Sequence, residues 1–223
     1  MSVSIAREDG AAMVMVIMAI GLIASLAVAL LLTSSSEVII ASHFRDQRVG
    51  FYAAEAIAER VLNDLAAADW NAVIVGAVRS TFIDGPPAGT RTVHGGTSID
   101  LVRAVNLANC QKSTACTVSE LDAVTAQRPW GVNNPRWQLF GYGRMRDLLP
   151  SSAIDVPWYA ILLAGDDPAH AADVIAVRAE AFGPRGAHAV LELIVARADP
   201  ADSDYNDPSG GSAVKILSWR EVR

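Results

Sequence analysis

The longest uncharged stretch of this sequence covers residues 11–32 and constrains the fold more than any other feature. It reads AAMVMVIMAIGLIASLAVALLL, and Ser25 is its only polar side chain. As a helix that rises about 1.5 Å per residue, it would be about 33 Å long, enough to cross the hydrocarbon core of a bilayer. We therefore expect an apolar helix over residues 11–33 that is either membrane-spanning or buried among other helices.

The helical pattern does not stop at the end of the apolar run. Residues 34–68 contain no proline and a single glycine, Gly50. Apolar side chains recur there at spacings of three, four or seven, which is typical of one face of a helix. These residues are Ile40, Phe44, Phe51, Ala54, Ala58, Leu62 and Leu65. We predict an amphipathic helix extension over residues 34–68 whose stripe packs on the rest of the chain.

Three ordinary explanations of the first 36 residues remain open. A cleaved secretory signal would place its cleavage site after residues 27–29, Ala-Val-Ala, although the apolar run is longer than usual and residues 1–10 are net acidic. A permanent signal anchor is the second explanation, and a buried core helix is the third.

The remaining residues, 69–223, are enough for one compact head with its own core. Four segments have the alternation or the apolar run of strands: residues 159–164, 174–182, 187–197 and 214–222. The sequence Gly-Pro-Arg-Gly at residues 183–186 predicts a tight turn between the second and third. We therefore predict an α+β fold in which the long helix packs on a C-terminal antiparallel sheet.

The middle of the chain gives weaker signals. Residues 70–79 could be a strand or the frayed end of the helix, and residues 97–105 alternate as a half-buried strand does. Residues 119–122 suggest a short helix capped by Ser119. Aromatic residues are frequent after residue 129, and we expect most of them in the core: Trp130, Trp137, Phe140, Tyr142, Trp158 and Tyr159.

The two cysteines, Cys110 and Cys116, are the whole cysteine content of the chain. No C-x-x-C motif or neighbouring ligand suggests a redox or zinc site, so we predict a structural disulfide. The chain-entropy model assigns roughly 2–2.5 kcal/mol to a ring of this size. Because disulfides persist in oxidising compartments, the pair favours a head outside the cytoplasm.

Two acidic clusters are candidate metal sites. Asp202, Asp204 and Asn206 alternate as in a calcium loop, but Asp207 stands where an EF-hand needs glycine and no glutamate closes the loop. We therefore expect no cofactor, with calcium as the alternative. The second cluster consists of Asp166, Asp167, His170 and Asp173.

Little in the sequence favours catalysis or nucleic-acid binding. His94-Gly95-Gly96 is similar to an oxyanion loop, yet no G-x-S-x-G nucleophile motif accompanies it. The net charge is −6 and no basic stripe is visible, so the chain has no footprint for nucleic acid. We expect a protein that is not an enzyme.

A short hydrophilic leader that ends in Gly10, followed by an apolar helix that runs into an amphipathic one, resembles a type IV pilin precursor. The sequence HFRDQRVGFYAAEAIAERVL at residues 43–62 is similar to PilX-type minor pilins and related pseudopilins, as is the ending LSWREVR at residues 217–223. The resemblance implies cleavage by a prepilin peptidase between Gly10 and Ala11 and methylation of the new N-terminus. It also implies that the helix packs against sister subunits, with Gly21, Ala24, Phe44, Phe51 and Glu55 as the candidate packing residues.

Two positions depart from the pilin pattern. The first mature residue would be Ala11 where these proteins usually have Phe, and the fifth would be Met15 where they usually have Glu. That glutamate is thought to neutralise the N-terminal amine of a neighbouring subunit, since an unpaired charge in an apolar filament core is costly. Its replacement by Met15 implies a minor subunit that initiates or caps a filament, and it equally leaves open a pilin-like protein that never joins a filament.

The expected function is therefore a minor pilin-like structural subunit in the initiation, tip formation or assembly of a type IV pilus. Its expected partners are other pilins, the prepilin peptidase and, before assembly, the membrane. It would cross the bacterial inner membrane once, with an extracytoplasmic head, before joining a surface filament. The alternatives are a pseudopilin of a type II secretion system, a membrane-anchored extracytoplasmic binding module or, less favoured, an anchored hydrolase.

Overall fold

A computed structural model describes residues 8–93, 96–126, 136–148, 156–166, 173–198 and 214–222 of the chain. Its longest element is helix α1, Glu8–Ala67. The chain divides into two compact units, residues 1–45 and residues 46–223, and each is described by itself. The first unit contains the predicted apolar helix, and the second contains the end of α1 and the head.

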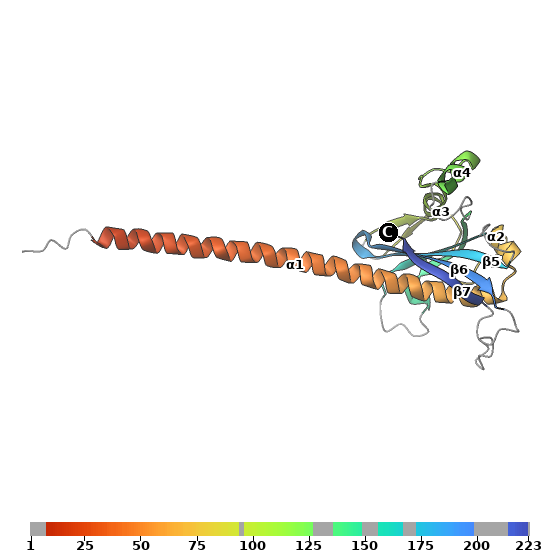
Figure 1. The fold of residues 1–223 in the computed structure, drawn as a ribbon, viewed down its shortest axis with the longest axis horizontal. Helices are drawn as coiled ribbons and strands as arrows, with labels where there is room; N and C mark the ends of the chain where they lie inside the picture. The colour runs from red at the N-terminus through yellow and green to blue at the C-terminus, as the bar shows by residue number, and fades with distance from the viewer. Residues whose placement is uncertain are drawn as a thin grey trace, which may run out of the picture. The chain divides into compact units, whose positions relative to one another are not determined.

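The head is built on a five-stranded antiparallel sheet in the order β3-β4-β5-β6-β7, so that sequential strands are neighbours (Figure 1). The strands are β3 (Gln138–Arg144), β4 (Tyr159–Asp166), β5 (Val174–Phe182), β6 (His188–Arg197) and β7 (Val214–Val222). The predicted meander over the last four strands is confirmed, and the predicted turn is the 3-10 segment η2, Pro184–Gly186, between β5 and β6. The coarse prediction of a long N-terminal helix followed by an antiparallel sheet therefore holds.

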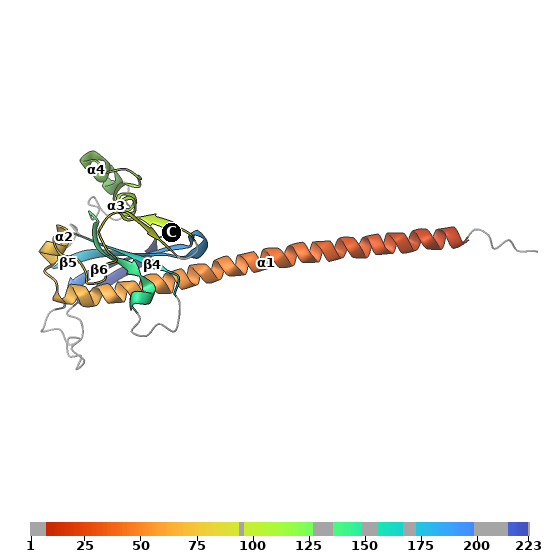
Figure 2. The same cartoon turned by 180° about the vertical axis from the view of Figure 1, so that it is seen from behind.

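The remaining elements of the head are short. They are α2 (Trp70–Ile74), the hairpin of β1 (Thr90–Thr92) and β2 (Ser98–Asp100), α3 (Leu101–Cys110), α4 (Val118–Ala126) and the 3-10 turn η1 (Met145–Leu148). Seen from both sides, the sheet lies between the end of α1 and helix α3 (Figure 2).

The two faces of the sheet have separate cores. On one face, the last turns of α1 bury Ile57, Val61 and Leu65 against Leu162 and Val177 of the sheet. On the other face, α3 and the β1–β2 hairpin cover an aromatic cluster that contains Trp137, Tyr142 and Tyr159. Burial of apolar surface on both faces explains why the inner strand β4 is apolar at nearly every position rather than alternating.

The predicted stripe on the helix was displaced by part of a turn. Ala54, Ala58 and Leu65 are buried as predicted, but Ile40 and Phe44 are 68% and 58% exposed. The stripe also omitted Ile57 and Val61, which are 0% and 1% exposed. Ile40 and Phe44 belong to the first unit, residues 1–45, and are not part of the head's core. Within the head unit, the spacing rule allows several registers of one apolar face on an alanine-rich helix, and only the sheet selects between them.

Two of the weaker predictions hold only in part, because a helix cap overrides strand-like alternation. Within residues 97–105, only Ser98–Asp100 is a strand, and α3 begins at Leu101. The Asp100 carboxylate accepts a hydrogen bond from the backbone N–H of Arg103 at 2.8 Å, which is the bond an N-cap makes. Residues 70–79 likewise start as a short helix, α2, capped by Asp69.

Helix α4 also has a different cap from the predicted Ser119. The Glu120 side chain accepts from the backbone N–H of Thr117 at 2.9 Å, and the backbone N–H of Glu120 donates to the Thr117 hydroxyl at 3.4 Å. This reciprocal pair is a capping box, and its T-x-x-E pattern was legible in the sequence. The hydrogen bonds from Lys112 and Thr117 lower the pKa of Glu120 to about 2.

The aromatic prediction is confirmed where the structure describes it. Trp137, Phe140, Tyr142, Trp158 and Tyr159 are all at most 4% exposed. Trp130 lies outside the described residues. One tryptophan behaves differently: Trp219 on β7 is 62% exposed.

Candidate functional site

The apolar part of α1 is the first candidate site. Its 18-residue window of highest mean hydropathy, 2.8, has no residue buried inside the chain, and no other helix in the described ranges is long and apolar enough to cross a membrane. This finding argues against the buried core helix considered from the sequence. The helix can therefore serve as a single membrane span or as a packing surface for other helices.

Hydroxyl groups on this helix are satisfied by its own backbone. Ser25 donates to the carbonyl of Leu22 at 2.8 Å, and Thr33 donates to the carbonyl of Leu30 at 2.9 Å. Ser36 makes the equivalent bond to Leu32 at 3.0 Å. Such bonds lower the cost of placing a hydroxyl in an apolar medium, because an unsatisfied donor there is expensive.

The predicted processing and packing residues lie in different environments. Gly10 and Ala11 lie within α1, and a side chain built on Gly10 or Gly21 would meet nothing within 4 Å. Ala24 is exposed as well. The small residues thus leave a surface on which a neighbouring helix can approach closely.

Of the other three predicted packing residues, Phe44 is 58% exposed in the first unit, and Phe51 and Glu55 belong to the head. Phe51 is partly buried against the α1 core, and its ring centroid lies 6.2 Å from that of Trp219. Glu55 is exposed. They line a groove of about 170 Å³ between α1 and the strands β6 and β7, which we call the β7 groove.

The β7 groove has an apolar floor and an acidic side. Leu191 and Leu193 of β6 and Ile216 of β7 contribute apolar surface, and Trp219 stands beside them. Glu55 and Glu59, one helical turn apart on α1, line the same groove. Phe51 and Glu55 were predicted as packing residues from the sequence, but Trp219 was not. The local sequence pattern of an exposed aromatic residue on an edge strand is the same as that of a buried one.

The opposite face of β5, β6 and β7 carries a buried ladder of charges. Arg178 donates to Glu180 and to Glu192, each at 2.6 Å, and Arg220 donates to Glu192 at 2.8 Å through its Nε. The ring of His188 lies 3.0 Å from Glu180. The strand patterns in the sequence do not show which of these charged side chains pair.

The charges of this ladder stabilise one another. Burial by itself would raise the pKa of Glu180, but the hydrogen bond from His188 and the charge of Arg178 outweigh burial and hold that pKa below 4.5. Burial likewise opposes the charge of Arg178, and the two glutamates nevertheless raise its pKa. Glu180 and Arg178 are therefore both charged at neutral pH, and the ion pairs of the ladder tie three strands together.

The predicted disulfide is present. Cys110, the last residue of α3, is bonded to Cys116, two residues before α4 begins. Gln111 follows Cys110 in the left-handed conformation that commonly ends a helix, so the bridge closes the loop between α3 and α4. Among the described residues, no group of His, Cys, Asp or Glu side chains that could hold a metal ion lies at this bridge.

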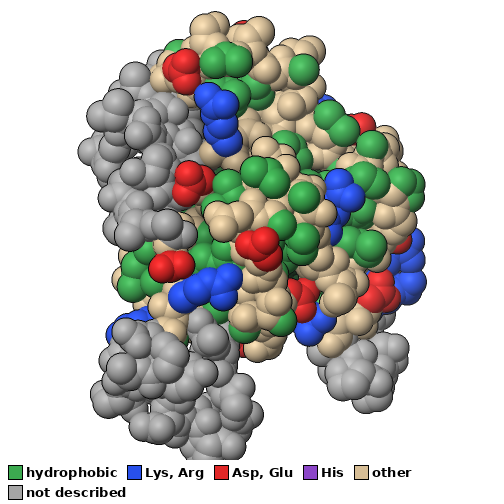
Figure 3. Space-filling view, turned by 90° about the vertical axis from the view of Figure 1, so that its right-hand side faces the viewer, with side chains coloured by type: hydrophobic (Ala, Val, Ile, Leu, Met, Phe, Trp, Pro, Cys, Tyr) green, Lys and Arg blue, Asp and Glu red, His purple; other side chains and the backbone are tan. Residues whose placement is uncertain are grey.

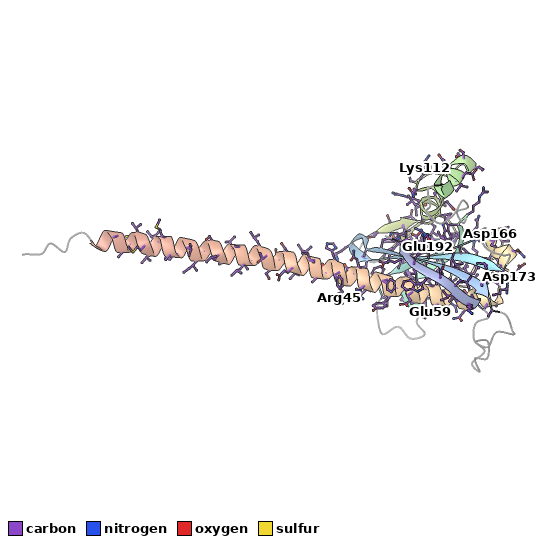
Figure 4. The ribbon with its side chains drawn as sticks, viewed as in Figure 1. Arg45, Glu59, Lys112, Asp166, Asp173 and Glu192 are labelled. Atoms are coloured by element: carbon purple, nitrogen blue, oxygen red, sulfur yellow. A yellow bond between two sulfur atoms is a disulfide. The ribbon has the colours of Figure 1, made fainter. Side chains whose placement is uncertain are left out.

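The candidate metal residues are mostly not placed. Asp202, Asp204, Asn206 and Asp207 lie outside the described residues, as do Asp167 and His170 of the second cluster. Asp166 and Asp173 lie at neighbouring ends of β4 and β5 (Figure 4). Among the residues that the structure describes, no group of three His, Cys, Asp or Glu side chains could hold a metal ion.

The charge on the head surface is mixed. On the face drawn in Figure 3, Lys and Arg side chains are interspersed with Asp and Glu and with apolar groups. Comparison of the chain with protein-family models, curated proteins and solved structures finds no match.

Proposed function

We propose that this chain is a minor subunit of a pilin-like filament, anchored in the membrane by the apolar part of α1 before assembly and held by helices of other subunits afterwards. The observation that carries the proposal is the N-terminal apolar helix, long enough to span a membrane and unburied within its own chain. A helix of this kind needs an apolar environment that the chain itself does not provide, and lipid and a helix bundle are the two that fit.

Three further features support a structural role over a catalytic one. The helix has small residues at Gly21 and Ala24 for close packing. The head described here is a packed sheet with a charge ladder and a disulfide, features that stabilise a fold. The resemblance of residues 43–62 to PilX-type minor pilins names the class, and Met15 in place of glutamate favours an initiating or tip position.

Two alternatives share the same architecture. A pseudopilin of a type II secretion system would be processed and packed in the same way, so it differs in the machine it joins. A membrane-anchored binding module would keep its N-terminal segment and would never enter a filament. Exposure of Trp219 beside the β7 groove is the observation that favours this second candidate.

The mature N-terminus distinguishes these possibilities. The full chain is produced with and without an active prepilin peptidase, and its N-terminus is read by intact mass and by peptide sequencing. We expect the peptidase to yield a chain that begins with N-methylated Ala11 and a Gly10→Val variant to remain uncut. A chain that keeps residue 1 beside a processed control pilin, or that begins at residue 30 after signal cleavage, would overturn the proposal.

A further inference from the structure

We propose that the β7 groove docks a cationic segment of a partner protein. In this arrangement one large apolar side chain of the partner enters the groove beside Trp219, and Lys or Arg side chains lie against Glu55 and Glu59. The inference uses only residues of the head unit, so it stands whether or not the chain joins a filament.

The two edges of the sheet are treated differently. At the β3 edge, the backbone N–H of Ser80 donates to the carbonyl of Phe140 at 2.8 Å, and the backbone N–H of Tyr142 donates to the carbonyl of Phe82 at 2.9 Å. Residues 80–83 therefore cover that edge. At the other edge, β7 is the last strand, and no further strand pairs with it in the described residues. The last strand of a sheet is a common place for another chain to associate.

Apolar side chains are exposed at this edge in a way that the other strands do not share. Ile216, Leu217 and Trp219 are 44%, 48% and 62% exposed, whereas β4 and β5 are almost entirely buried. A cluster of exposed apolar side chains marks interaction sites on soluble surfaces. Tryptophan in particular contributes most to binding when a partner removes it from water.

The charge of the groove selects the partner. Glu55 and Glu59 are both exposed, and neither has an ion-pair or hydrogen-bond partner in the part of the chain that is described (Figure 4 labels Glu59 on α1). They lie at i and i+4, so they face the same side of the helix and repel each other. A cation placed between them relieves that repulsion, whereas an anionic lipid surface or a nucleic acid would increase it.

The volume of the groove fits one side chain, and its charge excludes the segment that joins β6 to β7 as the occupant. A volume of about 170 Å³ matches one large side chain, since a cavity of roughly 150 Å³ holds a benzene ring. The segment that joins β6 to β7, residues 199–213, contains Asp199, Asp202, Asp204 and Asp207 and no Lys or Arg. It has the same sign as the groove and cannot supply the cation.

The proposal can be tested with the full chain in detergent micelles. A random peptide library displayed on phage is selected against the immobilised protein, and the most enriched peptide is synthesised with a fluorophore for anisotropy titration. We expect the enriched peptides to combine Lys or Arg with Leu, Ile, Phe, Met or Trp. We also expect the affinity to fall as salt is raised from 50 to 300 mM, since exposed ion pairs are screened.

Variants locate the binding site. Trp219→Ser and the double variant Glu55→Lys with Glu59→Lys should each weaken the peptide by at least tenfold. The matched controls on α4, Val118→Ser at an exposed valine and Asp122→Lys at an exposed carboxylate, should leave its affinity within twofold. Because the residues at 55 and 59 are exposed, the double variant tests the site even if Trp219→Ser disturbs the strand.

Several outcomes would overturn the inference. Selection that enriches no peptide, or only peptides without Lys and Arg, would exclude a cationic partner. Equal affinity for the wild type and the two groove variants would place the binding elsewhere. Self-association of the wild type that Trp219→Ser abolishes would make a second copy of the chain the occupant instead.

Discussion

Glycine 50 shows how a single residue fixes the packing of α1 on the head. A Cβ atom at this position would lie 2.8 Å from the Trp158 ring and 3.2 Å from Ala189. The Trp158 ring is itself 4% exposed, and a Cβ at Gly183 would meet it at 2.6 Å. The indole therefore packs between two glycines. Gly50 suits this position in the middle of the helix because the indole leaves no room for a side chain, although glycine is a poor helix former.

Substitution of this glycine should destabilise the head although alanine is the better helix former. Alanine in place of glycine ordinarily favours a helix by about 1 kcal/mol. At Gly50 the clash with Trp158 should reverse the sign, so that Gly50→Ala lowers the free energy of unfolding by about 1–3 kcal/mol, as overpacking does. Urea unfolding followed by tryptophan fluorescence measures the change.

The matched control is Gly21→Ala, which makes the same substitution in the same helix. Gly21 has nothing within 4 Å, so the control should leave the unfolding of the head unchanged. Equal stability of the two variants would show that Trp158 can move aside without cost.

At the residue scale, features that depend on residue type could be predicted from the sequence, but contacts between side chains could not. Gly50 was identified as the one glycine of the extension and Cys110 was paired with Cys116, because both facts depend on residue type alone. Ile57 and Val61 were omitted from the helix stripe, because the choice between registers depends on which residues of the sheet lie opposite. Exposure of Trp219 likewise depends on β7 being an edge.

At the scale of elements, the charge ladder across β5, β6 and β7 should make the stability of the head depend on pH. The pKa of Glu180 is lowered in the folded chain, so its contribution is fully present above the unfolded value of 4.5. As pH falls through the lower folded pKa, Glu180 takes up a proton and that contribution is lost. Acidification from pH 6 to pH 3 should therefore reduce the free energy of unfolding.

The variant Glu180→Gln separates this residue from the general effect of acid. At pH 7 it should cost about 3 kcal/mol, because the buried Arg178 loses one of its two carboxylate partners. The difference in stability between wild type and variant should narrow at pH 3, because pH 3 lies below the unfolded pKa of 4.5 and part of the contribution of the carboxylate is then lost. Urea titrations at both pH values measure the difference in the free energy of unfolding between wild type and variant.

The control for Glu180→Gln is Glu55→Gln, which changes an exposed carboxylate of the same head. It should shift stability by less than about 0.5 kcal/mol at either pH, as exposed charges do. A gap for Glu180→Gln that stays constant between pH 7 and pH 3 would mean that Glu180 is not ionised in the ladder.

Elements with their own strong pattern were predictable, and those fixed by a cap or a neighbour were not. Strands β4 to β7 and the end of α1 at Ala67 agree closely with the sequence analysis. Strand β3 was missed because Gly141 and Gly143 interrupt its pattern. Both are needed there, since a Cβ would meet Leu162 at 3.0 Å or the Phe82 ring at 2.8 Å.

At the scale of the whole molecule, the proposal rests on an apolar helix that needs a partner outside its own chain. This need is predictable from the sequence, because a run of 22 uncharged residues is long enough to cross a membrane as a helix. The β7 groove, which combines α1 with two strands from the far end of the chain, could not be predicted. The helix would supply attachment and the groove would supply recognition, so the two functions can be tested apart.

Attachment is tested by placing charge on the apolar helix. Leu22 and Leu26 are 64% and 57% exposed and lie one turn apart. Arginine at both positions should cost about 5–7 kcal/mol at the centre of a bilayer, at roughly 2.5–3.5 kcal/mol each. We expect Leu22→Arg with Leu26→Arg to move the chain from the carbonate-resistant membrane pellet into the soluble fraction or into degradation.

The same pair of charges outside the apolar helix provides the comparison. Val38→Arg with Ser42→Arg also adds two arginines one turn apart, beyond residue 33, and should stay in the pellet. Peptide binding by the β7 groove should survive this control variant in detergent, because residues 38 and 42 lie outside the head unit. If Leu22→Arg with Leu26→Arg remained as resistant to carbonate as the control, the apolar helix would not be the anchor.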